Sequence, residues 1–165
     1  MSALRIAVLG GGPIGIETAL HYADRRLHID SLALETAPGS VVRAEGWMAV
    51  GEEPAFSIAA EWTGFRWPLT GKALLVSPQG RLAAEGWTDF SYRLSGDFRP
   101  AAGPPVAGEA TGRVTTSAIL VDDSSWRLLG GRAVLKGSLG RDAPQAWSAA
   151  GRATDVDPAA LRKEL

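Results

Sequence analysis

Between residues 41 and 147, apolar and polar side chains alternate in short runs, and clusters of Gly, Pro, Asp and Ser separate the runs. Alternation of this kind is typical of β-strands that have one face toward an apolar interior. The strand regions that we expect are Val41–Val50, Ala55–Leu69, Lys72–Leu94, Glu109–Val121 and Ser125–Leu139. Because no helical period is found in this stretch, the sequence predicts antiparallel strands joined by short turns.

The stretch Lys72–Leu94 is expected to form one hairpin. Lys72–Ser77 is a short apolar run, Pro78-Gln79-Gly80 has turn chemistry, and Arg81–Leu94 returns as one long strand. A glycine inside such a strand, here Gly86, marks a bend or a close backbone approach. A long bent strand is typical of a small barrel, so we expect an antiparallel β-barrel of roughly seven to nine strands.

The segment before this region has a different pattern. The apolar run Leu4–Leu9 leads into a glycine-rich turn, residues 14–26 keep helical spacing, and His28–Glu35 has the composition of a second strand. Residues 3–35 thereby resemble the opening of FAD- or NAD(P)-dependent oxidoreductases. The resemblance implies that the glycines would admit a pyrophosphate to a helix N-terminus, and that an acid would hold a ribose. In this reading the cofactor-binding residues are Gly10, Gly12, Gly15 and Glu35.

The later sequence does not continue a nucleotide-binding domain, which needs further crossover helices and parallel strands. We therefore expect residues 1–38 to be a Rossmann-like βα segment that packs on the barrel or caps it, without a cofactor. Residues 39–165 are expected to form the barrel domain. Within it, Ser95–Gly108 is predicted to be a rim or lid loop, and Pro158–Leu165 a short helix capped by Asp157. Binding of FAD or NAD(P) stays open as the alternative.

The amino-acid composition excludes several classes of chemistry and of partner. The chain of 165 residues has no cysteine, two histidines, six tryptophans and a formal charge of -1. Disulfides and thiolate chemistry are thus excluded, and the charge gives no reason to expect nucleic acid or an anionic membrane as a partner. No apolar stretch is long enough to span a bilayer, so we expect a cytoplasmic protein. Plentiful aromatic surface with few titratable groups favours the binding of an apolar ligand.

The segment Gly80–Phe90, GRLAAEGWTDF, resembles the AEGWxDF strand of small bacterial spirotetronate and spirotetramate cyclases. Gly112-Arg113, Trp126-Arg127-Leu128 and Gly130 are similar to the last barrel strands of that family, so the resemblance covers residues 72–139. It implies a homodimeric β-barrel enzyme, a Diels–Alderase, which catalyses an intramolecular [4+2] cycloaddition of a polyketide-derived substrate without a cofactor.

Aromatic residues are the candidate binding residues, since Phe65 and Trp67 share one strand face at period two, and so do Phe90 and Tyr92. With Trp126 they would either line a substrate cavity or fill the barrel core, and the resemblance favours the cavity. A cycloaddition transfers no proton, so we expect no catalytic acid, base or metal. Orientation of the substrate would supply the rate, and Tyr92 or an indole would donate a hydrogen bond to it.

Acid–base chemistry has few candidates, and we expect Glu85 and Asp89 to be solvated strand carboxylates. Two other functions stay open. One is a flavin- or nicotinamide-binding oxidoreductase module, and the other is a non-catalytic carrier of an apolar metabolite.

Overall fold

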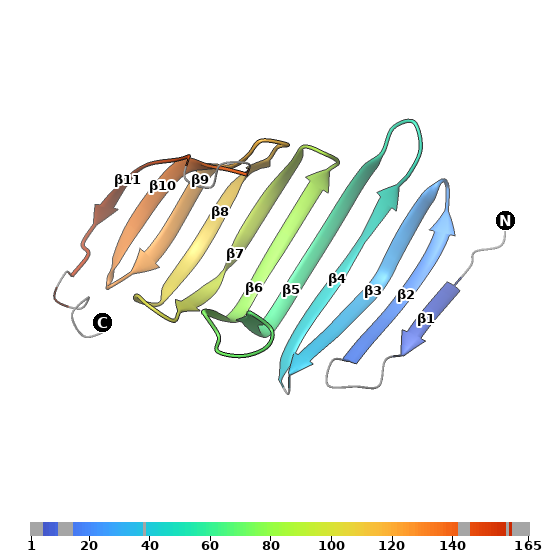
Figure 1. The fold of residues 1–165 in the computed structure, drawn as a ribbon, viewed down its shortest axis with the longest axis horizontal. Helices are drawn as coiled ribbons and strands as arrows, with labels where there is room; N and C mark the ends of the chain where they lie inside the picture. Colours follow the sequence, from blue (N-terminus) through green and yellow to red (C-terminus); the bar gives the residue numbers. More distant parts are fainter. Residues whose placement is uncertain (1–4, 10–14, 38, 142–145, 158, 160–165) are drawn as a thin grey trace.

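The computed structural model describes residues 5–9, 15–37, 39–141, 146–157 and 159. They form one antiparallel sheet of eleven strands (Figure 1). The strands are β1 Arg5–Leu9, β2 Gly15–Ala23, β3 Arg26–Ala37, β4 Ser40–Ala49, β5 Ala55–Trp67, β6 Leu75–Gly86, β7 Phe90–Pro100, β8 Val106–Val114, β9 Ala118–Leu128, β10 Gly131–Gly140 and β11 Trp147–Thr154. The prediction of a mainly β, antiparallel chain is confirmed.

The strands lie in the sheet in the order in which they occur in the chain, so each pairs only with its neighbours in sequence. Figure 1 shows β1 and β11 at opposite edges of the sheet. Closure into a barrel requires the first and last strands to pair, which does not happen here. The prediction of a β-barrel is therefore wrong, and the fold is an open meander.

The sheet is a single layer. The substantial contacts between strands all join consecutive strands, from β1 with β2 to β10 with β11. Among the described residues, the buried apolar side chains are only Ala110 and Ala133. A compact monomer of this mass exposes about 7,800 Å², whereas this chain exposes 11457 Å². In the part of the chain that the structure describes, the usual two-layer core is thus missing and a large surface is accessible.

Strand register assigns every residue to one of two faces, because directly paired residues of an antiparallel ladder point to the same side. One such row crosses five strands: Val42 pairs with Trp62, Trp62 with Gly80, Gly80 with Gly96, and Gly96 with Gly108. The adjacent row on the opposite side joins Arg43, Glu61 and Arg81. The sheet is therefore amphipathic across the strands.

The predicted hairpin of residues 72–94 has a different turn. β6 runs straight through Pro78-Gln79-Gly80, and the chain reverses at residues 87–89 before β7 begins. The ladder shifts register between Val76 and Gln79, so a bulge accommodates the proline. Gly86 lies at the turn with a φ of 139°, and a Cβ at this position would collide with Asp89 and Phe90. The prediction that Gly86 marks a close backbone approach is correct. The predicted single strand Arg81–Leu94 is in fact parts of two strands, β6 and β7, which the turn joins.

The predicted N-terminal βα segment is replaced by strands. Residues 15–23, which were expected to be helical, form β2 and pair with β3 from Gly15–Glu35 to Ala23–Arg26. The sequence of β2 also carries a period of two, with Ile16, Thr18 and Leu20 on one face. That period prevails because β3 offers a ladder with the matching alternation.

Three further predictions can be compared with the structure. β3 pairs with β4, so the same sheet continues across the expected domain boundary at residue 38. The predicted loop Ser95–Gly108 is mostly the end of β7 and the start of β8. The predicted C-terminal helix falls almost entirely outside the described residues, although the Ala159 N–H does donate to the Asp157 carboxylate over 2.9 Å.

Glycines inside the strands accommodate aromatic side chains that lie flat on the sheet. A Cβ at Gly80 would collide with the indole of Trp62, and one at Gly112 would lie 2.7 Å from the Tyr92 hydroxyl oxygen. A Cβ at Gly96 would lie 3.3 Å from the Phe98 ring. The Trp62 and Tyr92 rings thus cover the backbone of the adjacent strand, and the Phe98 ring lies over its own strand. Aromatic side chains commonly offset strand glycines in this way.

We expect Gly80→Ala to lower the free energy of unfolding by about 1–3 kcal/mol, because the added Cβ displaces the Trp62 ring. It would also lie 2.9 Å from the Ser95 carbonyl oxygen. Urea unfolding followed by far-UV circular dichroism measures the change.

Gly15→Ala is the matched control, since its Cβ would lie at an ordinary 3.7 Å from the Glu35 Cβ. It should stay within about 0.5 kcal/mol of the parent protein. Equal losses in the two variants would show that ring packing is not the reason for Gly80.

Candidate functional site

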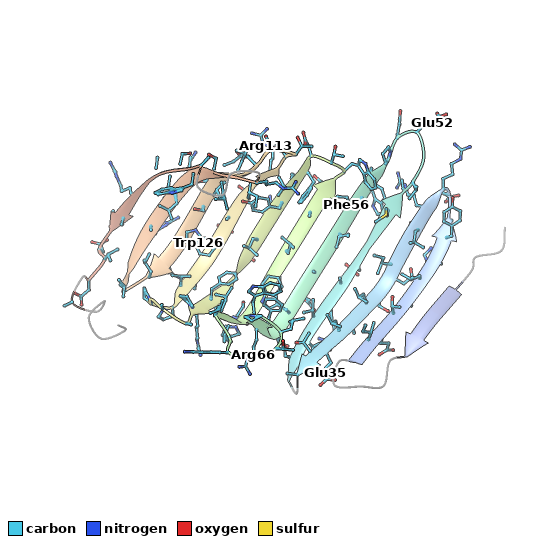
Figure 2. The ribbon with its side chains drawn as sticks, in the orientation of Figure 1. Glu35, Glu52, Phe56, Arg66, Arg113 and Trp126 are labelled. Carbon is cyan, nitrogen blue, oxygen red and sulfur yellow. The ribbon has the colours of Figure 1, made fainter. Side chains whose placement is uncertain are left out.

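One face of the sheet carries no charged side chain in any of the strands β2–β11, and we call it the apolar face. It combines branched aliphatic, aromatic, alanine and glycine residues. Its large side chains include Ile16, Leu20, Tyr22, Leu27, Ile29, Leu32, Leu34, Val42, Met48, Phe56, Ile58, Trp62, Phe65, Trp67, Leu75, Leu82, Phe90, Tyr92, Leu94, Phe98, Val106, Val114, Ile119, Val121, Trp126, Leu128, Leu135, Leu139 and Trp147. Figure 2 views this side, with Phe56 and Trp126 over the strands and Glu35 and Glu52 near hairpin ends.

The apolar face is open to solvent. Several of its large side chains are among the most exposed apolar residues of the protein, including Leu82, Leu135 and Leu139 at 38–43% exposure and Trp147 at 70%. Contiguous apolar surface of this extent is uncommon on a monomer and marks a place where something binds. The apolar face is therefore the candidate functional site.

The structure brings all five predicted binding residues onto or beside this face. The Phe90 ring packs edge-on against Phe56 at 5.5 Å between centroids, and Trp126 packs in the same way against Phe98 at 5.9 Å. Tyr92 follows Phe90 at period two.

Phe65 lies 6.1 Å from the ring of Trp62, which the sequence reasoning did not single out. The fifth predicted residue, Trp67, lies at the end of β5 and is 56% exposed. The predicted aromatic residues thus form pairs spread over the sheet and do not enclose one cavity.

Several polar groups on the apolar face are engaged within the protein. The Trp62 indole N–H donates to the Ser77 hydroxyl oxygen at 2.7 Å, and the Ser77 hydroxyl donates to the Asp97 carbonyl oxygen at 2.7 Å. The Tyr92 hydroxyl donates to the Leu120 carbonyl oxygen at 3.1 Å. Tyr92 was a candidate donor to a substrate, but in this structure its hydroxyl hydrogen joins β7 to β9.

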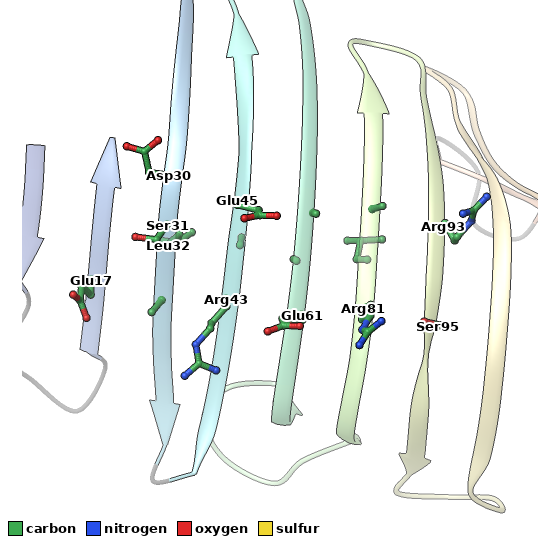
Figure 3. A pocket seen from close by; sticks show the side chains of 16 residues that line it. Glu17, Asp30, Ser31, Leu32, Arg43, Glu45, Glu61, Arg81, Arg93 and Ser95 are labelled. Carbon is green, nitrogen blue, oxygen red and sulfur yellow. The ribbon is translucent and has the colours of Figure 1, made fainter. Parts of the chain in front are cut away.

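The opposite face, which we call the charged face, carries ionisable side chains on successive strands. A hollow of about 750 Å³ lies over β2–β7, with small side chains such as Ala59 and Ala83 on its floor. Arg43, Glu61 and Arg81 border it (Figure 3). These three occupy paired positions with alternating charge, an arrangement that stabilises a ladder. The charged face thus helps to fix strand register.

The predicted acid–base candidates have structural positions. Glu85 lies on the charged face opposite Ser57 and Ser91, away from the aromatic rings. Asp89 is in the β6–β7 turn, where its carboxylate accepts a hydrogen bond from the Thr116 N–H at 3.1 Å. Neither faces the apolar surface.

Cofactor and metal sites have little support in the described part of the chain. Gly10 and Gly12 lie outside the described residues, while Gly15 and Glu35 form a cross-strand pair between β2 and β3. This pair does not precede a helix, which the dinucleotide reading requires. The described residues also contain no group of three or more His, Asp or Glu side chains placed to hold a metal ion. In the same residues, no helix has the length and apolar character to cross a membrane.

The sequence reasoning missed the contribution of β2 and β3 to the apolar face. Leu27, Ile29, Leu32 and Leu34 of β3 are directly paired with apolar-face residues of β4. The signal was an alternation that a bulge interrupts, since the ladder shifts register between Ile29 and Leu32. If the two-residue alternation is applied separately to the residues before and after that shift, all four residues fall on one face.

Comparison of the chain with protein-family models, with curated proteins and with solved structures finds no match. The fold and the face assignment define the protein as an open, antiparallel, amphipathic β-sheet with one uncharged face.

We expect Tyr92→Phe to destabilise the protein by about 0.5–1.5 kcal/mol at neutral pH, through loss of the hydrogen bond to Leu120. Burial raises the pKa of the Tyr92 phenol above its usual range, and the nearby Asp122 carboxylate raises this pKa further. The folded state thus disfavours the phenolate. Stability from Tyr92 is complete below about pH 10, the unfolded pKa, and falls as the pH rises above it.

Urea unfolding at intervals between about pH 8 and 11 should show a smaller alkaline loss in Tyr92→Phe than in the parent protein. Tyr22→Phe, at an exposed tyrosine of β2, is the control and should follow the parent curve. Identical pH dependence in all three proteins would contradict the role given to Tyr92.

Proposed function

We propose that the protein is a non-catalytic carrier whose apolar face binds the acyl chains of lipid-like amphiphiles. The observation that carries the proposal is the complete absence of charge from one open face of β2–β11, while the other face is densely charged. Burial of apolar surface stabilises a complex by about 25 cal/mol per Å². Because the apolar face is not buried when the protein folds, its apolar surface can still be buried by a ligand, and this burial would stabilise the complex.

The dimensions of the apolar face support an extended ligand. The ten strands β2–β11, spaced by about 4.8 Å, span about 43 Å across the sheet. Along a strand, the apolar positions of β3 run from Leu27 to Leu34, which is about 23 Å at the usual rise per residue. One leaflet of a bilayer has an acyl region of about 15 Å. The face therefore accommodates at least one full acyl chain in either direction.

The surface chemistry supports a chain in preference to a polar metabolite. Backbone amides of the inner strands are paired in the ladder, and the tyrosine, serine and indole donors described above have partners within the protein. Rings that lie flat over glycines leave a low surface without deep pockets. Such a surface offers dispersion contacts along its whole length and few directional contacts.

The cycloaddition expected from the resemblance is a weaker proposal. Catalysis by confinement requires walls on several sides of the substrate, so that it is held in a reactive conformer and water is excluded. The described residues supply one wall, because the sheet is a single open layer. Lipid-chain binding needs only that wall, and it uses the same aromatic residues, Phe90, Tyr92 and Trp126.

Binding should depend on which face is altered. Leu82 and Ala83 are consecutive, exposed residues of β6 that point to the apolar and the charged face, respectively. Leu82→Lys should weaken binding of a fluorescent C18 fatty acid by about tenfold or more, since a lysine ammonium would be desolvated beneath the chain. Ala83→Lys should change the dissociation constant by less than about twofold.

Fluorescence titration measures both constants, and circular dichroism checks that both variants are folded. Equal affinity in Leu82→Lys and Ala83→Lys would contradict binding on the apolar face. Absence of saturable binding in the parent protein would overturn the proposed function.

Contact between the chain and the apolar face has a spectroscopic signature. A bromine atom on an acyl chain quenches tryptophan fluorescence only at close range, so a brominated fatty acid should quench the parent protein. Trp126→Phe should remove part of the quenchable emission, because Trp126 lies on the apolar face. Trp47→Phe is the control, since Trp47 lies on the charged face with the Arg26 guanidinium 4.1 Å from its ring centroid. A larger loss of quenching in Trp47→Phe than in Trp126→Phe would place the ligand on the wrong face.

A further inference from the structure

The last strand, β11, presents an unprotected sheet edge. It pairs with β10 over its whole length without a register shift, and no strand of the described chain pairs with its other side. All eight of its residues are exposed. Natural sheet edges are usually blocked by proline, by a bulge, by several charges or by being very short. β11 has none of these features except one charge, Arg152.

The hydrogen bonding of the β10–β11 ladder shows which backbone groups are available at this edge. The Gly140 N–H donates to the Ala146 carbonyl oxygen at 2.8 Å. Hydrogen-bonded and non-hydrogen-bonded pairs alternate along an antiparallel ladder. The N–H and C=O groups that point away from β10 are therefore those of the alternate residues Trp147, Ala149, Gly151 and Ala153.

We propose that β11 pairs antiparallel with β11 of a second copy of this chain, about a two-fold axis that passes between the two Ala150 residues. In this register Ala149 faces Gly151 of the second copy, and Trp147 faces Ala153. The outward backbone groups of one strand then meet those of the other, as a ladder requires. Arg152 faces Ser148, so the only charged residue of the strand does not meet its own copy.

The same register preserves the two faces of the sheet. Trp147, Ala149, Gly151 and Ala153 continue the apolar face of β10. Because each of them pairs with another member of this set, the two apolar faces join on one side of the doubled sheet. A register shifted by one residue would place the apolar face of one copy beside the charged face of the other. The alternation within β11 therefore selects its own copy as a matching partner.

The proposed pairing of β11 does not depend on lipid binding, because the experiments that test it use the protein without any ligand. If β11 does not pair, each copy still has its complete apolar face. If lipid does not bind, the edge of β11 is still free. The two proposals consequently fail in different experiments.

The absence of cysteine from the chain makes a crosslinking test direct. In the proposed register Ala150 faces Ala150 of the second copy in a non-hydrogen-bonded pair, with about 4.5 Å between Cα atoms. This lies within the range that a disulfide spans. Ala150→Cys should therefore crosslink to a covalent dimer under mild oxidation.

Ser148→Cys is the matched control, because it lies on the same strand and the same face. In the proposed register position 148 faces Arg152, and the two introduced thiols are separated by about four residues of strand, roughly 13 Å. Ala150→Cys should crosslink about tenfold faster than Ser148→Cys or more. Similar rates for the two variants would indicate random collision or another register, and would overturn the proposal.

Sedimentation equilibrium of the unaltered protein gives the second readout, and a dimer is expected. Ala149→Pro removes an outward N–H from the edge while the bond pattern to β10 is kept, so it should give a monomer. Ala149→Val keeps the N–H and should stay dimeric. A monomeric parent protein at about 100 μM, or a dimer in Ala149→Pro with unchanged circular dichroism, would show that β11 is not the interface.

Discussion

Pairing between consecutive strands is the interaction on which this structure depends. In most β-proteins a second layer buries one face of the sheet and supplies much of the stability. Here the contacts that hold one strand come from its two neighbours, and the described part of the chain has very little buried apolar surface. Cross-strand pairs contribute about 0.2–1 kcal/mol each, so many small contributions replace a core.

This constraint explains the contrast between the two faces. On the charged face, rows such as Arg43, Glu61 and Arg81 alternate in sign from strand to strand and oppose a slip of register. On the apolar face, rings such as those of Trp62 and Tyr92 lie over glycines of the neighbouring strand and so connect the two strands. These rings lie along the sheet and project little from its surface. Register is thereby fixed from both sides of the sheet. The apolar face nevertheless stays open, which is what binding of a long apolar chain requires.

An open meander also leaves sheet edges without a partner strand. The apolar face and the edge of β11 are both accessible, but they offer different chemistry. The apolar face offers dispersion and the hydrophobic effect, which are tolerant of ligand structure. The edge of β11 offers backbone hydrogen bonds in a defined alternation, which are selective for a strand in the right register. Lipid chains suit the first surface and a second copy of the strand suits the second. Pairing at the edge would lengthen the apolar face without altering its composition.

Local alternation within the sequence determined the strand content, the ends of β4 and β5, and the shared face of Phe90 and Tyr92. These properties follow from the two-residue period of a strand, which needs no partner to be recognised. The same pattern was misread where helix and strand periods coincide, as in β2, and where a proline inside β6 suggested a turn. In both places the neighbouring strand decided the outcome by supplying a ladder.

The tertiary structure alone decided that the sheet stays open. Alternation is the same in a barrel and in a meander, because both bury or expose one face of every strand. Closure depends on the distance and pairing between the first and last strands, which no local pattern encodes. Whether Phe65, Phe90 and Trp126 line a cavity or lie on an exposed face follows from that global geometry. The sequence thus determined which residues share a face, and the tertiary structure determined that this face is accessible.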